Sequence, residues 1–235
     1  STAGYWTFAA SVADYDSDGY DDLYAYASGP AYQWHVLRST GTGIATTPIA
    51  TGMPSTGSSG WAVSDSTGDG LADLGAVSMG TGTWQTRAHL GVPGERLASV
   101  LDGFGVSVAF SHAPLTDGTV HTKYATAAYP TQELQRPWWV VKQLTATDGS
   151  GSASTYTQTY SYEGARRDVN GRGFLGFAKR ISVDGRLGYN LRTEESYSQA
   201  FPYIGLVTTE SLKQSSGTRI REITNTWAAL TLGAR

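Results

Sequence analysis

Short runs in which apolar or aromatic residues alternate with polar ones dominate the second half of the chain. The clearest is TYTQTYSYE at 155–163, which puts three tyrosines and a glutamine on one side and threonines with a serine on the other. A period of two is that of a half-buried β-strand. No segment keeps a helical period, so the pattern predicts an all-β chain.

Turn residues separate these runs and predict hairpins. The other strand-like runs are 106–112, 138–147, 177–183, 189–197, 206–214 and 218–227. Asp184-Gly185 and Ser216-Gly217 lie between the last two pairs of runs, and such glycine-containing turns suit β-hairpins. We therefore expect an antiparallel β-meander over residues 93–235.

A repeat of 51 residues occupies the first part of the chain. Each copy has an aromatic residue, a short apolar run, an Asp-rich loop, the dipeptide Asp-Leu and a second apolar run, and the loops begin at Asp14 and Asp65. A further hairpin-like stretch follows each copy, near residues 32–39 and 83–91. About four short strands per repeat are typical of a propeller blade. We expect a partial β-propeller-like region of two blades at 1–92.

Composition narrows the function classes. With 7 Trp, 14 Tyr, 6 Phe and only 16% charged residues, the chain is not disordered, and its 29 glycines fit a fold rich in turns. The net charge of −3 and the absence of a long apolar run predict neither nucleic-acid binding nor direct membrane insertion. The lack of cysteine excludes disulfides, Cys-ligated zinc and thiol catalysis. The first residues do not read as a signal peptide, and we expect a piece of a longer chain.

The loop DYDSDGYDDL at 14–23 carries the strongest chemical signal. Carboxylates stand at loop positions one, three, five and nine, with glycine at position six. Ca²⁺ prefers six to eight oxygen ligands, and clustered carboxylates repel one another without a cation. The candidate ligands are the side chains of Asp14, Asp16, Asp18 and Asp22 and the carbonyl of Tyr20. An EF-hand is excluded because position twelve is Ala25, within a strand-like run.

The second loop, DSTGDGLADL at 65–74, keeps three of the four carboxylates. Asp65, Asp69 and Asp73 hold positions one, five and nine, and Thr67 offers a neutral oxygen at position three. This copy should therefore bind a cation more weakly. The alternative is a pair of Asp/Gly turns without metal; the recurrence of the loop in register favours calcium.

Both loops resemble the FG-GAP/VCBS-type calcium repeat of integrin-like propellers, whose core pattern is DxDxDGxxDL or DxxGDGxxDL. The resemblance implies Ca²⁺ loops that brace propeller blades in extracellular proteins. In the second loop it implies Asp65, Thr67, Asp69, the Leu71 carbonyl and Asp73 as ligands. A propeller needs at least four blades, and two motifs do not close one.

The later part of the chain resembles the middle region of the B component of bacterial Tc insecticidal toxins, shared with SpvB-like and Rhs-type proteins. The matching stretches are 97–118, 129–144, 160–184 and 201–212, and the most specific is GRGFLGF at 171–177. The resemblance implies a large Rhs-type β-shell, with an attached propeller, that encloses a toxic domain until delivery. Neither that toxic domain nor YD repeats are recognisable here.

No residue pattern indicates catalysis. The four histidines, His35, His89, His112 and His121, lack metal-ligand spacing. Ser111-His112 with Asp102 or Asp117 would make a triad only by chance, and Glu194 and Glu195 should face opposite sides of one strand. We therefore expect no enzyme.

The sequence thus favours a structural module of a secreted, extracellular bacterial toxin. Its expected partners are other parts of the same toxin chain or complex. The alternative is an extracellular binding or adhesion module, in which the propeller face recognises a glycan or protein receptor through exposed aromatic residues.

Overall fold

The computed structural model describes residues 10–27, 33–54, 58–78, 81–89, 94, 96–147, 154–186 and 190–229. In these residues every regular element is a β-strand, which confirms the all-β prediction. None of them forms a helix that could span a membrane. The chain divides into two compact units, Ser1–Arg96 and Leu97–Arg235.

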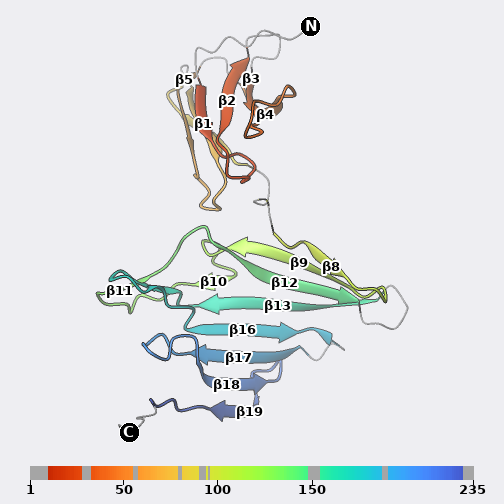
Figure 1. Ribbon diagram of the computed structural model, residues 1–235, viewed down its shortest axis with the longest axis vertical. Coiled ribbons are helices and arrows are strands. Elements are labelled where there is room, and N and C mark those ends of the chain that lie inside the picture. Colours follow the sequence, from red (N-terminus) through yellow and green to blue (C-terminus); the bar gives the residue numbers. More distant parts are fainter. Residues whose placement is uncertain are drawn as a thin grey trace, which may run out of the picture. The chain divides into compact units, whose positions relative to one another are not determined.

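The first unit, called here the repeat unit, contains two antiparallel sheets. One has the order β1-β2-β3-β4 (Figure 1), and the other has the order β5-β6-β7. The strands are β1 (Ala10–Ala13), β2 (Asp22–Ala27), β3 (Gln33–Leu37), β4 (Ile49–Pro54), β5 (Ser58–Ser64), β6 (Asp73–Ser78) and β7 (Trp84–Arg87). In each sheet an Asp loop joins the first two strands. The 51-residue sequence repeat is therefore also a repeat of structure, although the described strands form no closed ring.

A compact core joins the two sheets of the repeat unit. Its buried side chains are Tyr24, Trp34, Val36, Met53, Leu74 and Ala76, from β2, β3, β4 and β6. The alternation along β3 explains this burial, because Trp34 and Val36 point into the core while the residues beside them are partly exposed. Each fully buried aliphatic side chain contributes about 1.5–3 kcal/mol, so this core accounts for much of the unit's stability.

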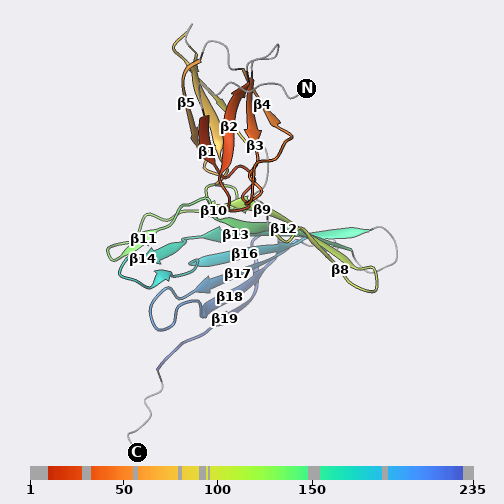
Figure 2. The same cartoon turned by 45° about the horizontal axis from the view of Figure 1, so that its top comes forward.

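The second unit, called here the sheet unit, is built on one long sheet. Its order is β19-β18-β17-β16-β13-β12-β9-β8, with β10 beside β13 (Figures 1 and 2). The strands are β8 (Ser99–Leu101), β9 (Ser107–Pro114), β10 (His121–Thr122), β12 (Trp139–Thr147), β13 (Thr155–Glu163), β16 (Lys179–Asp184), β17 (Leu191–Tyr197), β18 (Val207–Lys213) and β19 (Arg219–Thr224). All pairings along the path are antiparallel, as the meander prediction required, and only β10 pairs in parallel.

A second, small sheet has the order β11-β14-β15. Its strands are β11 (Thr131–Glu133), β14 (Arg166–Asp168) and β15 (Gly173–Phe174). The GRGFLGF block makes its last turn, and Gly171 and Gly173 adopt left-handed φ angles of +109° and +74°. Leu175 is buried and Phe177 packs on a core of Leu115, Leu134 and Ala165. Phe174 instead stays 42% exposed, so only part of the block anchors in a core.

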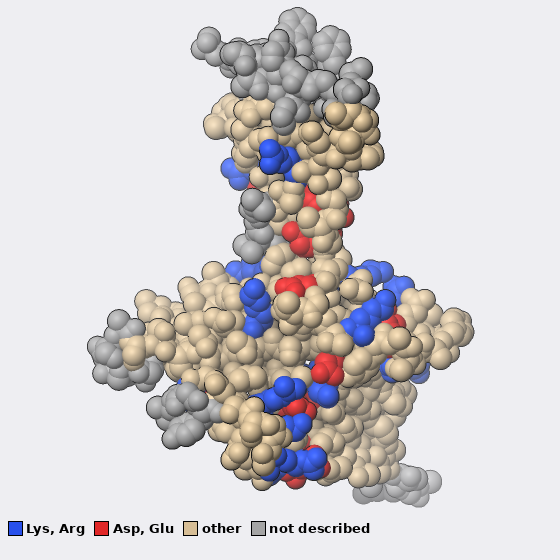
Figure 3. Space-filling model, turned by 180° about the vertical axis from the view of Figure 1, so that it is seen from behind, with Lys and Arg blue, Asp and Glu red and all other residues tan. Residues whose placement is uncertain are grey.

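The outer strands of the long sheet bury little on either face. Every residue of β17 is partly exposed, and every residue of β19 is exposed. Cross-strand ion pairs replace apolar contacts: Glu195 binds Arg180 at 2.5 Å, and its neighbour Glu194 binds Lys213 at 2.9 Å. Because successive side chains of a strand face opposite sides, these pairs lie on opposite faces. Figure 3 shows acidic and basic side chains intermingled on a mostly uncharged surface.

Candidate metal centre

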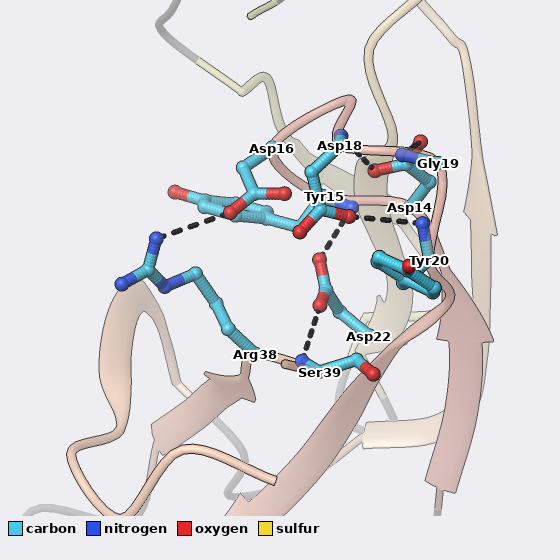
Figure 4. Close-up of polar contacts among 9 residues, drawn as sticks. All are labelled: Asp14, Tyr15, Asp16, Asp18, Gly19, Tyr20, Asp22, Arg38 and Ser39. Carbon is cyan, nitrogen blue, oxygen red and sulfur yellow. Dashed lines mark hydrogen bonds and ion pairs between the residues drawn. The ribbon is translucent and has the colours of Figure 1, made fainter. Parts of the chain in front are cut away.

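The loop between β1 and β2 is folded around the carboxylate of Asp14. Its Oδ1 accepts the Asp18 amide at 3.1 Å and its Oδ2 accepts the Gly19 amide at 3.0 Å (Figure 4). Asp18 Oδ1 in turn accepts the Tyr20 amide at 2.9 Å. Gly19 has φ +88°, a conformation that glycine adopts without strain. Short aspartate side chains that capture following amides keep this turn tight.

Three carboxylates meet inside the first loop. Asp14, Asp16 and Asp18 each offer an oxygen, and these oxygens lie within 4.8 Å of one another. Like charges at this separation destabilise the loop unless a cation or hydrogen-bond donors neutralise them. The spacing of alternate residues thus places three predicted ligands together.

Asp16 shows that hydrogen bonds do not satisfy this cluster completely. Its Oδ2 accepts from Arg38 Nη1 at 3.1 Å, whereas its Oδ1 is buried and has no hydrogen-bond partner among the described residues (Figure 4). A buried, unpartnered carboxylate oxygen is costly in free energy. An all-oxygen cluster with such an atom fits a hard cation such as Ca²⁺. The residues of the first loop therefore fit Ca²⁺, the metal that the resemblance to the calcium repeat implies.

Asp22 has a different position from the other three aspartates. It is fully buried, and both carboxylate oxygens accept amide hydrogen bonds, Oδ2 from Tyr15 at 2.8 Å and Oδ1 from Ser39 at 2.7 Å (Figure 4). It therefore fastens the start of the loop to Ser39, the second residue after β3. The sequence analysis predicts Asp22 as a ligand, but the structure does not bring it into the three-carboxylate cluster.

The fifth candidate of the first loop, Tyr20, contributes to packing as well. Its amide donates to Asp18, and its ring lies over Gly41, where an added Cβ would come within 2.9 Å of the ring. Gly41 also has φ +75°, so a side chain at this position is strained for two reasons. The segment after β3 thus supports the loop from outside.

The second loop repeats the hydrogen-bond network of the first. Asp65 Oδ1 accepts the amides of Gly68 and Asp69 at 2.6 and 3.0 Å, and its Oδ2 accepts the Gly70 amide at 2.9 Å. Asp69 Oδ1 accepts the Leu71 amide at 2.9 Å. Three of these four contacts have a counterpart in the first loop, and the bond from the Gly68 amide is additional. The two loops therefore share a fold as well as a sequence pattern.

Asp73 is the counterpart of Asp22. It is 1% exposed, its Oδ2 accepts from the amide and hydroxyl of Ser66 and the amide of Thr67, and its Oδ1 accepts the His89 amide at 2.8 Å. Burial opposes ionisation of Asp73, but the hydrogen bonds from His89, Ser66 and Thr67 outweigh it and lower its pKa below the usual value. Asp73, another predicted ligand, is thus held by donors from the protein itself.

The two loops differ at their third position. Asp16 of the first loop belongs to the three-carboxylate cluster, whereas Thr67 stands at the same position of the second. Among the described residues only the first loop forms a group of three acidic or histidine side chains. The first loop is accordingly the stronger candidate for a cation.

Each loop also contacts a residue of the other copy of the repeat. The Tyr15 ring stacks on His89 with centroids 4.0 Å apart and planes 11° apart. Tyr24 donates its hydroxyl to the carbonyl of Ala72 at 3.0 Å. Burial, reinforced by the negative charge of nearby acidic groups, raises the pKa of Tyr24, so its hydroxyl stays protonated as a donor. Each loop is therefore held in part by a residue of the other copy.

Comparison with known proteins assigns the chain to a protein family. Residues 38–196 match the sequence profile of a family described as the insecticide toxin TcdB middle/N-terminal region. The chain belongs to this family. The match spans the second half of the repeat unit and most of the sheet unit. No curated protein matches the chain.

Solved toxin structures share its fold. A TcdB2-TccC3-Cdc42 crystal structure aligns with a TM-score of 0.65 and 15% identity over 87% of this chain and 12% of that chain. A TcdB2-TccC3 structure gives a TM-score of 0.60 and 18% identity over 83% of this chain. A Photorhabdus luminescens Tc holotoxin pore gives 0.58 and 18% over the same share. This chain spans about a tenth of the length of those chains.

Sequence reasoning missed the residues that hold the loops from outside. Arg38, Ser39 and His89 lie 16 or more residues from the aspartates they contact. Two of these contacts are made by backbone amides, which no side-chain motif reveals. The available signal was the single basic residue directly after β3, which has no charged counterpart in the second copy.

Proposed function

We propose that this chain is a non-enzymatic structural module of a secreted Tc/Rhs-type toxin, forming part of the β-shell that encloses a toxic cargo. The observation that carries this proposal is the unbroken antiparallel sheet of the sheet unit, in a chain of the TcdB middle-region family. The related structures contain TcdB2 together with TccC3, which supports partners within the same toxin complex.

The chemistry of the long sheet suits a shell wall. Both faces of a shell wall contact solvent. Strands β16 to β19 carry ion pairs on both of their faces, which suits such contact. Among the described residues β8 and β19 are the edge strands of this sheet, and edge strands offer backbone groups to further strand pairing. In this proposal the sheet contains the cargo by continuity of hydrogen bonding rather than by a thick core.

Calcium bracing of the repeat unit is the second part of the proposal. Asp14, Asp16 and Asp18 would hold Ca²⁺, and the ion would neutralise carboxylates that the fold brings together. Asp22 and Asp73 would set the shape of the loops by binding amides. The two sheets of this unit would be blades of a propeller that is completed by other parts of the toxin.

The shell proposal is tested by breaking one ladder in the complete toxin. Thr193 in β17 faces Ser182 in β16 and Leu212 in β18, so Thr193→Pro removes a ladder donor in the middle of the sheet. Ser215→Pro is the matched control. It lies in an exposed turn closed by the Gly217 amide on the Gln214 carbonyl, at the position where proline is favoured.

We expect Thr193→Pro to expose the enclosed toxic domain to added protease, while Ser215→Pro leaves it protected. Equal protection of the cargo in wild type and Thr193→Pro, with both folded, would contradict a role in containment.

A binding module remains a second candidate because the repeat unit exposes aromatic rings. Trp84 is 62% exposed and Trp61 39% exposed. Exposed aromatic rings supply large contact areas in recognition sites. Specific binding on a glycan array, lost in Trp84→Ala, would favour this function over containment.

A further inference from the structure

One basic side chain is directed at the first Asp loop from outside it. Arg38, the residue directly after β3, places Nη1 3.1 Å from Oδ2 of Asp16, and its side chain is 51% exposed. Asp16 itself is 27% exposed in its side chain. Figure 4 shows the guanidinium reaching the carboxylate on the side away from Gly19 and Tyr20. The cluster of three carboxylates therefore already has one fixed positive charge beside it.

The second copy of the repeat shows which residue corresponds to Arg38. Leu37 pairs with Leu23 in the first sheet, and Arg87 pairs with Leu74 in the second. The position after Arg87 is Ala88. The next amide in each copy, that of Ser39 or His89, donates to the buried aspartate at the base of its loop. Register and hydrogen bonding therefore agree that Ala88 is the counterpart of Arg38.

Both members of the ion pair are absent from the second loop. Thr67 replaces Asp16, and Ala88 replaces Arg38, so the second loop lacks the extra negative charge and the positive charge beside it. The rest of the hydrogen-bond network is kept. The acidic and basic residues thus occur together or not at all within this chain.

We propose that Arg38 is an internal counter-cation of the first loop, which stabilises the metal-free loop and weakens its affinity for Ca²⁺. This inference rests on the calcium site of the proposed function. Arg38 occupies Oδ2 of Asp16 and leaves the buried Oδ1 for the ion, so both cations would act on one carboxylate. The guanidinium then repels the bound ion and also reduces the negative charge that attracts it.

The size of the effect follows from exposure. Because Arg38 is half-exposed, solvent screens its interaction with the cluster, and we expect a change of about three- to ten-fold in the calcium dissociation constant. Added salt should reduce this difference. At low calcium, Arg38 would thereby neutralise part of the carboxylate charge and keep the first loop folded. Once Ca²⁺ binds, the ion would neutralise that charge instead.

The test is calcium titration of the full chain by isothermal calorimetry, together with thermal melting in EDTA and in calcium. Asp69→Asn removes one of the three carboxylate charges of the second loop while its Oδ1 still accepts the Leu71 amide, and it serves as the common background. In that background Arg38→Gln should bind calcium about three- to ten-fold more tightly. It should also melt at a lower temperature than its parent in EDTA and at nearly the same temperature in saturating calcium.

Two controls keep the inference separate from a loss of folding. Arg38→Lys keeps the charge and should bind calcium with nearly the affinity of its parent. Ala88→Arg adds a positive charge beside the second loop, where Thr67 offers no carboxylate, and should leave the first site unchanged.

Unchanged or weaker calcium binding by Arg38→Gln, with the parent still binding, would overturn the role of Arg38 while leaving calcium bracing intact. Absence of calcium binding by the parent and all variants would overturn calcium bracing itself, and this inference with it.

Discussion

The two units solve the problem of stability in different ways. The repeat unit buries Trp34, Val36 and Leu74 between two small sheets and closes its loops with aspartates. The sheet unit extends one long ladder of strands whose outer members are solvated on both faces. A cooperative core makes a part that keeps its own shape, whereas a ladder makes a wall that other strands can continue. The same all-β composition thus builds a packed core in one unit and an extended ladder in the other.

Loss of a core side chain of the repeat unit should have the largest effect, well above truncation in the outer strands of the sheet unit. Trp34 is 2% exposed, so Trp34→Ala should cost about 3–5 kcal/mol of unfolding free energy. Ile223→Ala in β19, where the side chain is 41% exposed, is the matched truncation in the sheet unit and should cost less than about 1 kcal/mol. Urea denaturation followed by circular dichroism measures both. Equal costs would contradict the contrast between core and ladder.

Removal of a loop clamp comes next. Asp22→Ala leaves the amides of Tyr15 and Ser39 without their acceptor in a buried place, and should cost about 2–4 kcal/mol. Asp18→Ala removes one acceptor in an exposed part of the loop and should cost less than Asp22→Ala in the absence of calcium. Chemical denaturation in EDTA compares the two. The reverse order would show that Asp22 is not the main fastening of the loop.

Acid should weaken the repeat unit through Asp73. Its folded pKa is lowered, because amide and hydroxyl donors outweigh burial, so its contribution is present above the unfolded value of about 3.9 and is lost as pH falls through the folded value. Asp73→Asn should therefore be less stable than wild type at pH 7, and the gap should narrow below about pH 4. Denaturation at a series of pH values tests this, and a gap independent of pH would contradict it.

Single ion pairs of the sheet unit should matter least. Arg221 binds Glu210 at 2.7 Å across β18 and β19, but the two side chains are 59% and 33% exposed. Arg221→Gln should therefore change stability by no more than about 0.5 kcal/mol, and less in high salt. A loss comparable to that of Trp34→Ala would show that the ladder depends on individual pairs.

Sequence patterns predicted the features that depend on neighbouring residues, namely strands, turns and the Asp loops. Alternation and turn residues located β13, β16, β17, β18 and β19, and the spacing of aspartates located both loops. The short strands of the small sheet were missed, because β11 and β14 consist of three residues each and pair across more than thirty positions. The motif predicts Asp22 and Asp73 as ligands, but it does not show that their carboxylates also accept the amides of Ser39 and His89, which lie beyond β3 and β7.

The most direct test of calcium bracing is a pair of melting curves of the full chain, one with EDTA and one with calcium at about 100 times its dissociation constant. Mass action should then stabilise the repeat unit by about 2.7 kcal/mol, which raises its melting temperature by several degrees. In the double variant Asp16→Ala with Asp18→Ala most of that gain should vanish, because two of the three clustered carboxylates are gone. Identical wild-type curves with EDTA and with calcium would contradict the claim that a cation braces these loops.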